Sequence, residues 1–326
     1  MDKGTKLRLL YLYRHLVRYT DAENTLSTAQ LMQIMKEEYS VEVSRNTIAD
    51  DLEMLHACGM NINHYKSTQN KYYYDGQAFE TAELKLLIDA VCASKFITRK
   101  KADVLIGKLL SLTNAHTAAK LNRHVQAEGR ARSDNESGYY IVDAINDAID
   151  WGRKIRFRYT DYDINGKRYV SNEGRHYTVS PYSLIWDGDF YYMRGYCDER
   201  AAMRNFRLDR IAEQPESLPE AAVPRPENYS SVEYGRSTFR MYDTDEPVEL
   251  GLLCHVSVMK YLIDRFGEDV KMEPTDEEHV VATVSVCTGS TFYRWVFGFN
   301  GKIKIIGPDV VLDAYREMLQ NALNMQ

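Results

Sequence analysis

The chain has 326 residues, a length that is enough for two or three domains. Its composition, 44% hydrophobic and 27% charged, is that of an ordinary globular protein. Its net charge of −6 comes from residues 216–326, which carry 18 acidic and 10 basic side chains, so overall charge argues neither for nor against a nucleic-acid partner. No apolar run approaches the roughly 18 residues of a membrane span, and the five cysteines form no CxxC or Cys/His cluster. We therefore expect a cytoplasmic protein without a membrane partner, a disulfide framework or a metal site.

The N-terminal segment carries three helix signals in succession. Apolar residues recur at helical spacing over residues 3–19, which predicts a first helix. Ser27 followed by Gln30 is a capping box and predicts the start of a second helix. Ser44 is a cap residue for a third helix that extends to Cys58. Because two short helices joined by a tight turn form a helix-turn-helix, the third is the expected recognition helix.

A hairpin pattern follows this third helix. Two β-rich runs, Ile62–Lys66 and Lys71–Tyr74, flank the turn-prone residues 67–70. The hairpin is the expected wing, so residues 1–76 are predicted to form a winged helix-turn-helix that binds a double-stranded DNA operator. The residues expected at the DNA lie at the start of the recognition helix and on the hairpin: Ser44, Arg45, Asn46, Thr47, His64, Lys66 and Lys71. The alternative is a three-helix unit used for protein contacts.

The stretch Ser44–Leu52, with the sequence SRNTIADDL, resembles the winged-helix heads of DeoR-type regulators. The resemblance implies binding to duplex DNA. This chain departs from those heads at Asp50, where they usually carry an arginine before Asp-Leu. Because an acid replaces a phosphate-binding base there, we expect DNA affinity to depend more on Arg45, the wing and dimerisation.

Residues 77–137 are predicted to form a helical linker. Apolar stripes at helical spacing run from Glu80 to Val125 without a proline, and Thr81 and Thr98 are the expected helix starts. Such stripes usually pack against another domain or a second copy of the chain. The polar, glycine-containing stretch 128–138 closes the segment.

Residues 138–215 combine one helix with several short strands. Ile141, Ile145 and Ile149 lie at four-residue spacing and predict a helix over residues 139–151. Tight turns are expected at Asn165-Gly166 and at residues 187–189, and the expected strands are 155–159, 176–180, 183–186, 190–196 and 204–211. Short strands with tight turns predict a small, strongly bent sheet or partial barrel.

Three motifs in these strands resemble the WYL domain family: Pro181-Tyr182-Ser183-Leu184, Tyr191-Tyr192-Met193 in place of Trp-Tyr-Leu, and Arg204-x-Phe206-Arg207-Leu208-Asp209-Arg210-Ile211. The last run is the most specific. The resemblance covers residues 139–215. It implies a small, bent, Sm-like β domain that senses a nucleotide, a nucleic acid or another anionic effector on a basic patch.

Arginines and aromatic residues cluster in the same strands and support a ligand site independently. An arginine guanidinium binds phosphate through two parallel hydrogen bonds, and nucleic-acid bases stack on aromatic rings. Alternatively, the arginines pair with plentiful nearby acids such as Asp209. Arg204 and Arg207 have opposite parity along a regular strand, so their side chains point to opposite faces and we expect at least one of them to have a structural role. The residues expected to contact the effector are His176, Tyr182, Ser183, Tyr192, Arg194, Arg204, Phe206, Arg207 and Arg210.

Residues 216–246 are predicted to be a linker, since four of the eight prolines fall between Pro215 and Pro226. Residues 247–326 follow a β-α-β-β-α-β order with a closing helix, which is the ferredoxin-like pattern. By position and pattern this segment is similar to the C-terminal extension that accompanies WYL domains, which implies a role in dimerisation. The predicted fold class is therefore α+β with several domains: a winged helix-turn-helix, a helical linker, a small bent β domain and a ferredoxin-like domain.

Motifs of common enzyme classes do not occur in the sequence, which has no Walker loop, no GxGxxG after a strand, no HExxH and no GxSxG. We expect neither catalysis nor a cofactor. The hypothesis is a homodimeric bacterial transcription regulator whose operator binding is gated by a nucleotide or nucleic-acid effector. The rival hypothesis is a non-regulatory accessory protein that binds RNA or single-stranded DNA through the WYL domain.

Overall fold

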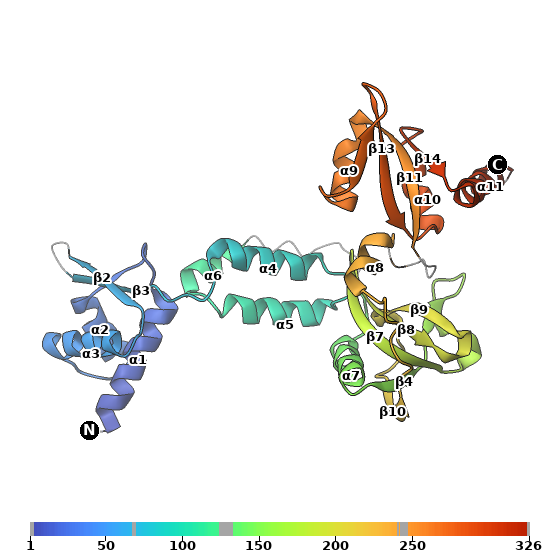
Figure 1. Cartoon of the computed structure of the whole chain (residues 1–326). Helices are drawn as coiled ribbons and strands as arrows, with labels where there is room; N and C mark the ends of the chain where they lie inside the picture. The colour runs from blue at the N-terminus through green and yellow to red at the C-terminus, as the bar shows by residue number, and fades with distance from the viewer. Residues whose placement is uncertain (1–2, 67–69, 124–132, 240, 242–246, 325–326) are drawn as a thin grey trace. The chain divides into compact units, whose positions relative to one another are not determined.

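The computed structural model describes residues 3–66, 70–123, 133–239, 241 and 247–324. The chain divides into two compact units, Met1–Arg132 and Ser133–Gln326 (Figure 1). It is a mixed α/β protein with several small sheets, which agrees with the predicted class at that level. Among the described helices, none combines the length and the apolar character needed to cross a bilayer.

The first unit begins with a small helical head. Its elements are α1 (Lys3–Tyr19), β1 (Leu26–Ser27), α2 (Thr28–Tyr39), α3 (Arg45–Ala57), β2 (Ile62–Lys66) and β3 (Asn70–Tyr74). The three strands form one antiparallel sheet in the order β1-β3-β2. The three predicted helices and the hairpin are confirmed, and so are the two caps. Ser27 and Gln30 form the capping box of α2, and the side chain of Ser44 accepts a hydrogen bond from the Thr47 amide at the start of α3.

The core of the head gathers apolar residues from every one of its elements. Leu12 and Leu16 of α1, Leu31 of α2, and Ile48 and Leu52 of α3 are buried together. These positions recur at three- and four-residue intervals, so each helix buries one face and leaves the other in solvent. Three α-helices therefore hold the hairpin against a single small core.

Three further helices follow in the described part of the first unit: α4 (Thr81–Ala93), α5 (Arg99–Leu110) and α6 (Ala115–Asn122). Thr98 caps α5 as predicted, whereas α4 is capped by a box between Glu80 and Glu83. Figure 1 shows α4 and α5 side by side, and Leu84, Ile88 and Ile106 are buried between these helices and α6. The predicted helical character is confirmed for the described residues 81–122 of this segment.

The second unit opens with α7 (Gly138–Asp150), on which Ile141 and Ile145 are buried as predicted. A five-stranded antiparallel sheet follows in the order β10-β4-β7-β8-β9. The strands of the sheet are β4 (Arg153–Phe157), β7 (Tyr177–Asp187), β8 (Phe190–Cys197), β9 (Ala202–Arg207) and β10 (Glu216–Ala221). A separate hairpin pairs β5 (Thr160–Tyr162) with β6 (Arg168–Val170) around the predicted Asn165-Gly166 turn.

Two strand predictions in this sheet were wrong in detail. The strands expected at 176–180 and 183–186 are one strand, β7, which continues through an irregularity in its register between Pro181 and Ser183. The strand expected over 204–211 ends at Arg207 and is followed by a 3₁₀ turn, Leu208–Arg210. A β-bulge lets one strand bend without ending. A local interruption of the apolar–polar alternation therefore does not show that one strand ends and another begins.

The segment predicted as a linker, 216–246, is structured in two places. Residues Glu216–Ala221 form β10 at the edge of the sheet, where Pro219 is tolerated because an edge strand leaves half of its amides unpaired. Ser231–Ser237 form a short helix, α8. The prolines therefore mark an edge strand and its exit rather than an unstructured connection throughout.

The C-terminal elements follow the predicted order. They are β11 (Val248–His255), α9 (Met259–Phe266), β12 (Lys271–Pro274), β13 (His279–Val286), α10 (Ser290–Phe297), β14 (Ile303–Gly307) and α11 (Asp309–Asn324). The sheet order is β12-β13-β11-β14 with every neighbouring pair antiparallel. Leu252, Ala282, Phe292 and Val311 lie in the core that joins this sheet to its helices.

Candidate functional site

The first turn of α3 is rigidly capped and faces solvent. The Ser44 hydroxyl accepts a hydrogen bond from the Thr47 amide at 3.2 Å and bonds the Thr47 hydroxyl at 2.8 Å. Arg45 and Asn46 follow the cap and are exposed. Four of the residues predicted at the DNA therefore lie together at one end of one helix, with the two longer side chains projecting from it.

The two acids that follow in α3 have different surroundings. Asp51 is buried, and its two carboxylate oxygens accept hydrogen bonds from Arg8 at 2.6 and 2.8 Å. This pair ties α1 to α3, and the carboxylate raises the pKa of Arg8. Asp50 is exposed, so the acid that replaces the expected arginine stands on the solvent face of α3.

The hairpin divides the residues predicted on the wing between its two faces. His64 lies opposite Tyr72 and Lys71 lies opposite Tyr65, and because side chains alternate along a strand, these two pairs point to opposite faces. Tyr72 is buried in the head, so the face with Lys71 and Tyr65 is the outer one. The side chain of Lys66 lies outside the described residues.

The central sheet brings four of the nine predicted ligand residues onto one face. Ser183 lies opposite Arg194 across β7 and β8, and Tyr192 lies opposite Arg207 across β8 and β9. Directly opposed residues share a face, and Tyr192 and Arg194 are two positions apart on one strand. We call this side of the sheet, defined by Ser183, Tyr192, Arg194 and Arg207, the ligand face.

Phe206 and Arg204 point to the other face of β9. The Phe206 ring packs at 5.2 to 5.5 Å from the rings of Phe157, Tyr159 and Tyr177, and all of them belong to an aromatic cluster inside the domain. Phe206 is 6% exposed. The structure therefore places this ring in the core and away from Arg207.

Arg207 is satisfied within the domain. Its guanidinium donates to both oxygens of the buried Asp209 at 2.7 and 3.1 Å and lies 3.4 Å from the centre of the Phe190 ring. This is the ion pairing that the sequence left as the alternative. A ligand at this position competes with an intact bidentate pair.

The remaining predicted ligand residues are spread around the domain. Arg210 sits in the 3₁₀ turn after β9, with its Nη1 3.7 Å from Asp161. His176 is exposed just before β7 begins. Tyr182 is buried and donates to the carbonyl of Pro224 at 3.2 Å. The Tyr182 ring also packs 5.7 Å from the ring of Tyr229, whose hydroxyl bonds Ser183 of the ligand face.

Arg194 is the central residue of the ligand face. It is 3% exposed, its Nη1 donates to Asn205 at 3.2 Å, and its guanidinium carbon lies 3.4 Å from the centre of the Tyr234 ring. Its Nε is buried without a hydrogen-bond partner within the described part of the chain. Burying a donor without an acceptor is costly, so this nitrogen marks a place where an acceptor would be stabilised.

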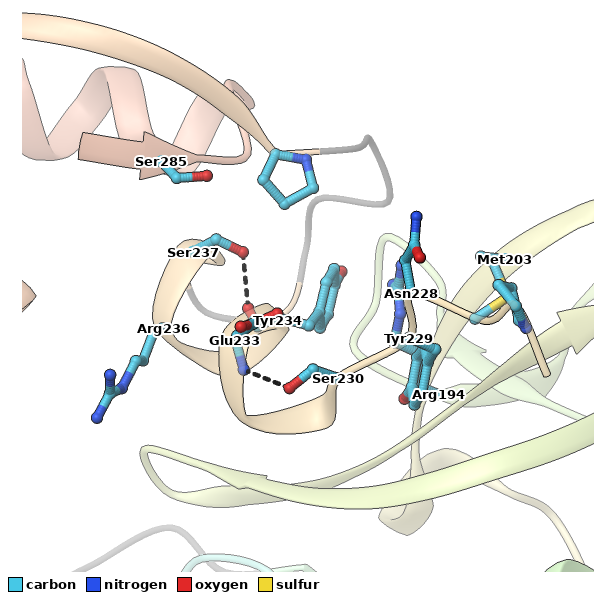
Figure 2. A pocket seen from close by; sticks show the side chains of 12 residues that line it. Arg194, Met203, Asn228, Tyr229, Ser230, Glu233, Tyr234, Arg236, Ser237 and Ser285 are labelled. Carbon is cyan, nitrogen blue, oxygen red and sulfur yellow. Dashed lines mark hydrogen bonds between the residues drawn. The ribbon is translucent and has the colours of Figure 1, made fainter. Parts of the chain in front are cut away.

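A cavity of about 480 Å³ opens beside Arg194 (Figure 2). Its walls come from β8, β9, the segment that contains α8, and the end of β13 at Ser285. Arg236 and Glu233 stand on the α8 side, and Figure 2 shows the hydrogen bond between Ser230 and the Glu233 amide that caps this helix. The volume is in the range of small-ligand pockets.

Sequence reasoning missed Asn205, Tyr229 and Tyr234. Tyr229 bonds the hydroxyl of Ser183, and Tyr234 accepts a hydrogen bond from Asn205 at 2.8 Å. Both tyrosines fall in the expected linker. The available signal was Ser230-x-x-Glu233, a capping-box pattern that marks a helix start.

Over the described ranges, no three His, Cys, Asp or Glu residues are grouped so as to hold a metal ion. The five cysteines form no disulfide, and only Cys58 is exposed. Burial raises the pKa of the Cys197 and Cys254 thiols to about 11, so both remain protonated at neutral pH.

Family comparisons identify two domains in the chain. Residues 140–215 match the WYL domain and residues 246–323 match the WCX domain. The chain therefore contains both, and the sequence resemblance is confirmed for these stretches. No curated protein matches the chain.

Two solved structures are similar to the chain at low identity. Proteasome accessory factor B/C (PafBC) of Arthrobacter aurescens is 18% identical with a TM-score of 0.30, and the match covers 100% of this chain and 49% of the PafBC chain. A CRISPR Cas-related protein is 15% identical with a TM-score of 0.37, and the match covers 99% of this chain and 84% of that one. This chain thus spans about half of PafBC. Both TM-scores are below 0.5, so neither structure assigns a function to this protein.

Proposed function

We propose that this chain, which contains a WYL domain followed by a WCX domain, is a DNA-binding transcription regulator with a winged helix-turn-helix head. The observation that carries the proposal is the start of α3, where a capped turn presents exposed Arg45 and Asn46 beside a β-hairpin. A recognition helix places its N-terminal residues against base edges in the major groove. The order of helices and strands in the head, three helices followed by a hairpin, supports the proposed docking.

Each predicted contact then has a chemical role. Arg45 and Asn46 are long enough to reach base edges, and arginine pairs with guanine while asparagine pairs with adenine. Ser44, Thr47 and the wing residues His64, Lys66 and Lys71 are the proposed phosphate contacts, which position the head without reading sequence. His64 and Lys71 lie on opposite faces of the hairpin and would therefore meet different phosphates. The exposed Asp50 weakens phosphate binding on α3, so a second head in a dimer compensates for it.

The C-terminal sheet supports the proposal that the regulator is a homodimer. Its order β12-β13-β11-β14, with β11 and β12 running in the same direction, supports the proposed ferredoxin-like domain. We propose that this domain joins two copies, so that two heads read a palindromic operator with half-sites about one helical turn apart. No catalytic step and no cofactor belongs to this function.

The ligand face supplies the proposed control. Arg194 offers an unfilled buried donor, and Tyr192 and Ser183 stand beside it. A nucleotide or single-stranded nucleic acid would place an anionic group on Arg194. An effector controls DNA binding only if it favours one arrangement of the two heads over the other.

A mobility-shift titration tests the function. The full-length chain is titrated with duplex DNA from its own promoter region, against random duplex and single-stranded competitors. We expect selective duplex binding, weakened at least tenfold in Arg45→Ala and unchanged in Arg99→Ala, which removes an exposed arginine at the start of α5. Affinity should fall steeply with salt because several phosphates are contacted.

The accessory-protein alternative has one observation in its favour: the acids Asp50 and Glu53 are exposed on α3, the proposed recognition helix. Preference for the single-stranded competitor without a selective duplex complex would replace the regulator by this alternative. In that case Arg45→Ala would leave binding unchanged.

A further inference from the structure

We propose that α8 is an internal plug on the ligand face, and that its release links effector binding to the C-terminal sheet. The proposal rests on the proposed function in one respect, namely that an effector with an anionic group and an aromatic ring binds at Arg194. It adds the regulation of that site by a segment of the same chain.

Tyr234 of α8 occupies the position that a ligand's ring would take. The guanidinium carbon of Arg194 lies 3.4 Å from the centre of the Tyr234 ring, and Asn205 donates a hydrogen bond to the Tyr234 hydroxyl. Tyr234 is 6% exposed. The contact between the Arg194 cation and this ring is strengthened because water is excluded from it. Because the Tyr234 ring already covers this side of the guanidinium, a base can stack there only after Tyr234 has moved away.

The plug satisfies Arg194 only in part. Its ring covers the guanidinium, but it supplies no acceptor, and the buried Nε is without a hydrogen-bond partner within the described residues. A phosphate brings several strong acceptors to the same group. An anionic ligand can therefore displace Tyr234 from Arg194 by supplying the missing acceptor. Within the part of the chain that the structure describes, Arg207 has no such unfilled donor to offer, because it already donates twice to Asp209.

The far end of α8 is fastened to the C-terminal domain. The carbonyl of Ser237 accepts a hydrogen bond from the Cys287 amide at 2.9 Å, and Arg265 of α9 donates to the carbonyl of Thr238 at 2.7 Å. The Cys287 side chain is fully buried and lies 3.6 Å from the Thr238 hydroxyl. A movement that frees Tyr234 must strain or break these bonds, and so it reaches the sheet that contains β13.

The chemical reactivity of Cys287 reports the position of α8. The experiment uses the full-length chain with Cys58→Ser, which removes the exposed thiol, and follows iodoacetamide labelling of each cysteine by peptide mass spectrometry. We expect Tyr234→Ala to raise the labelling rate of Cys287 at least tenfold. We expect Tyr234→Phe, which retains the ring, to stay within about threefold of the parent.

Gly235 provides a matched variant of opposite sign. A Cβ added there meets only Ile185, at 4.0 Å, so alanine fits, and alanine favours a helix over glycine. We expect Gly235→Ala to slow Cys287 labelling by about threefold, because the helix opens less often. Cys254, buried in the C-terminal core, is the internal reference for general unfolding and should keep its rate in every variant.

Equal labelling rates of Cys287 in the parent, Tyr234→Ala and Gly235→Ala would contradict the proposal that α8 is a plug. An increase in the labelling rate of Cys254 as large as that of Cys287 would also contradict it, because both thiols would then report general unfolding. Competition between Tyr234 and a ligand for Arg194 is tested by titration with fluorescent pentathymidylate. This probe should bind Tyr234→Ala about tenfold more tightly than Gly235→Ala. Equal affinities, or the reverse order, would contradict the proposal. The promoter mobility shift is independent of these readouts, so failure of the regulator and failure of the plug are distinguishable.

Discussion

At the scale of single residues, Asp50 and Asp51 show how environment separates two identical side chains. Asp50 is exposed on α3, whereas Asp51 is buried and bonded twice to Arg8. Removing one partner of a buried pair leaves the other partly desolvated and unpaired. The sequence motif contains both acids, but only one of them holds the head together.

We therefore expect Asp51→Ala to lower the free energy of unfolding of the head by about 2–3 kcal/mol. The neighbouring Asp50→Ala should stay within about 0.5 kcal/mol of the parent, as surface substitutions usually do. Urea unfolding followed by circular dichroism measures both. Equal effects of the two substitutions would contradict the role assigned to the Arg8–Asp51 pair.

His15 gives the head a pH dependence. It is buried in α1 beside Glu38 and Tyr39, and burial lowers its pKa below the usual 6.5 despite the opposing effect of Glu38. The unfolded chain therefore binds a proton more readily than the folded head. Stability from this residue is complete above about pH 6.5 and is lost as the pH falls below it.

The expected loss is less than about 1.4 kcal/mol per pH unit, because a single proton is involved. Urea midpoints at pH 7.5 and 5.5 measure it, with His15→Gln as the variant that cannot titrate. A drop of the same size in His15→Gln would assign the pH dependence to other groups.

At the scale of elements, the strand pair β7–β8 depends on one glycine. A Cβ at Gly195 would lie 2.4 Å from the carbonyl oxygen of Ser180 in the adjacent strand. Because that neighbour is backbone, the strands must separate to admit any side chain. Gly195→Ala should therefore destabilise the second unit by at least about 2 kcal/mol.

Gly107 in α5 is the matched control, since an added Cβ meets nothing within 4 Å. Alanine there should stabilise the first unit by about 0.5–1 kcal/mol, from the difference in helix propensity. Thermal unfolding of the two variants should shift in opposite directions. Tolerance of Gly195→Ala without a shift would show that the two strands are less closely paired than described.

The elements were largely predictable because their signals are local. Caps such as Ser27 and Ser44, and four-residue spacing such as Ile141 and Ile145, determine helices within a few residues. The edge strand β10 was not predictable, since its pairing with β4 joins residues about 60 positions apart. The short helix α8 was missed because its cap signal, Ser230 and Glu233, follows directly after a proline-rich stretch that predicted a linker.

The ligand residues were only partly predictable for a related reason. Strand alternation correctly separated Arg204 from Arg207, and the structure places them on opposite faces. Alternation could not show whether Arg207 faces a ligand or its own Asp209, since both are compatible with the same pattern. The role of Arg194 depends on Tyr234, which reaches it from a segment 40 residues further along the chain.

At the scale of the whole molecule, the division into two units has a spectroscopic consequence. All three tryptophans, Trp151, Trp186 and Trp295, lie in the second unit, while the first unit has none. Tryptophan emission therefore reports the second unit alone, whereas circular dichroism reports both. We expect Asp51→Ala to lower the midpoint of the first unit's unfolding, seen by circular dichroism, and to leave the midpoint seen by tryptophan emission unchanged. A common shift in both signals would show that the units unfold together.

The edge strand β10 decides where the central domain can be cut. The WYL match ends at residue 215, immediately before β10, and a fragment that stops there would leave the amides and carbonyls of β4 unpaired along an open edge. Exposed edges of this kind recruit strands from other molecules. Such a fragment would be expected to aggregate, while one extended to Val223, whose amide donates to Ser180, would remain monodisperse. The working boundary of this domain is thus set by backbone pairing and lies beyond its recognisable sequence.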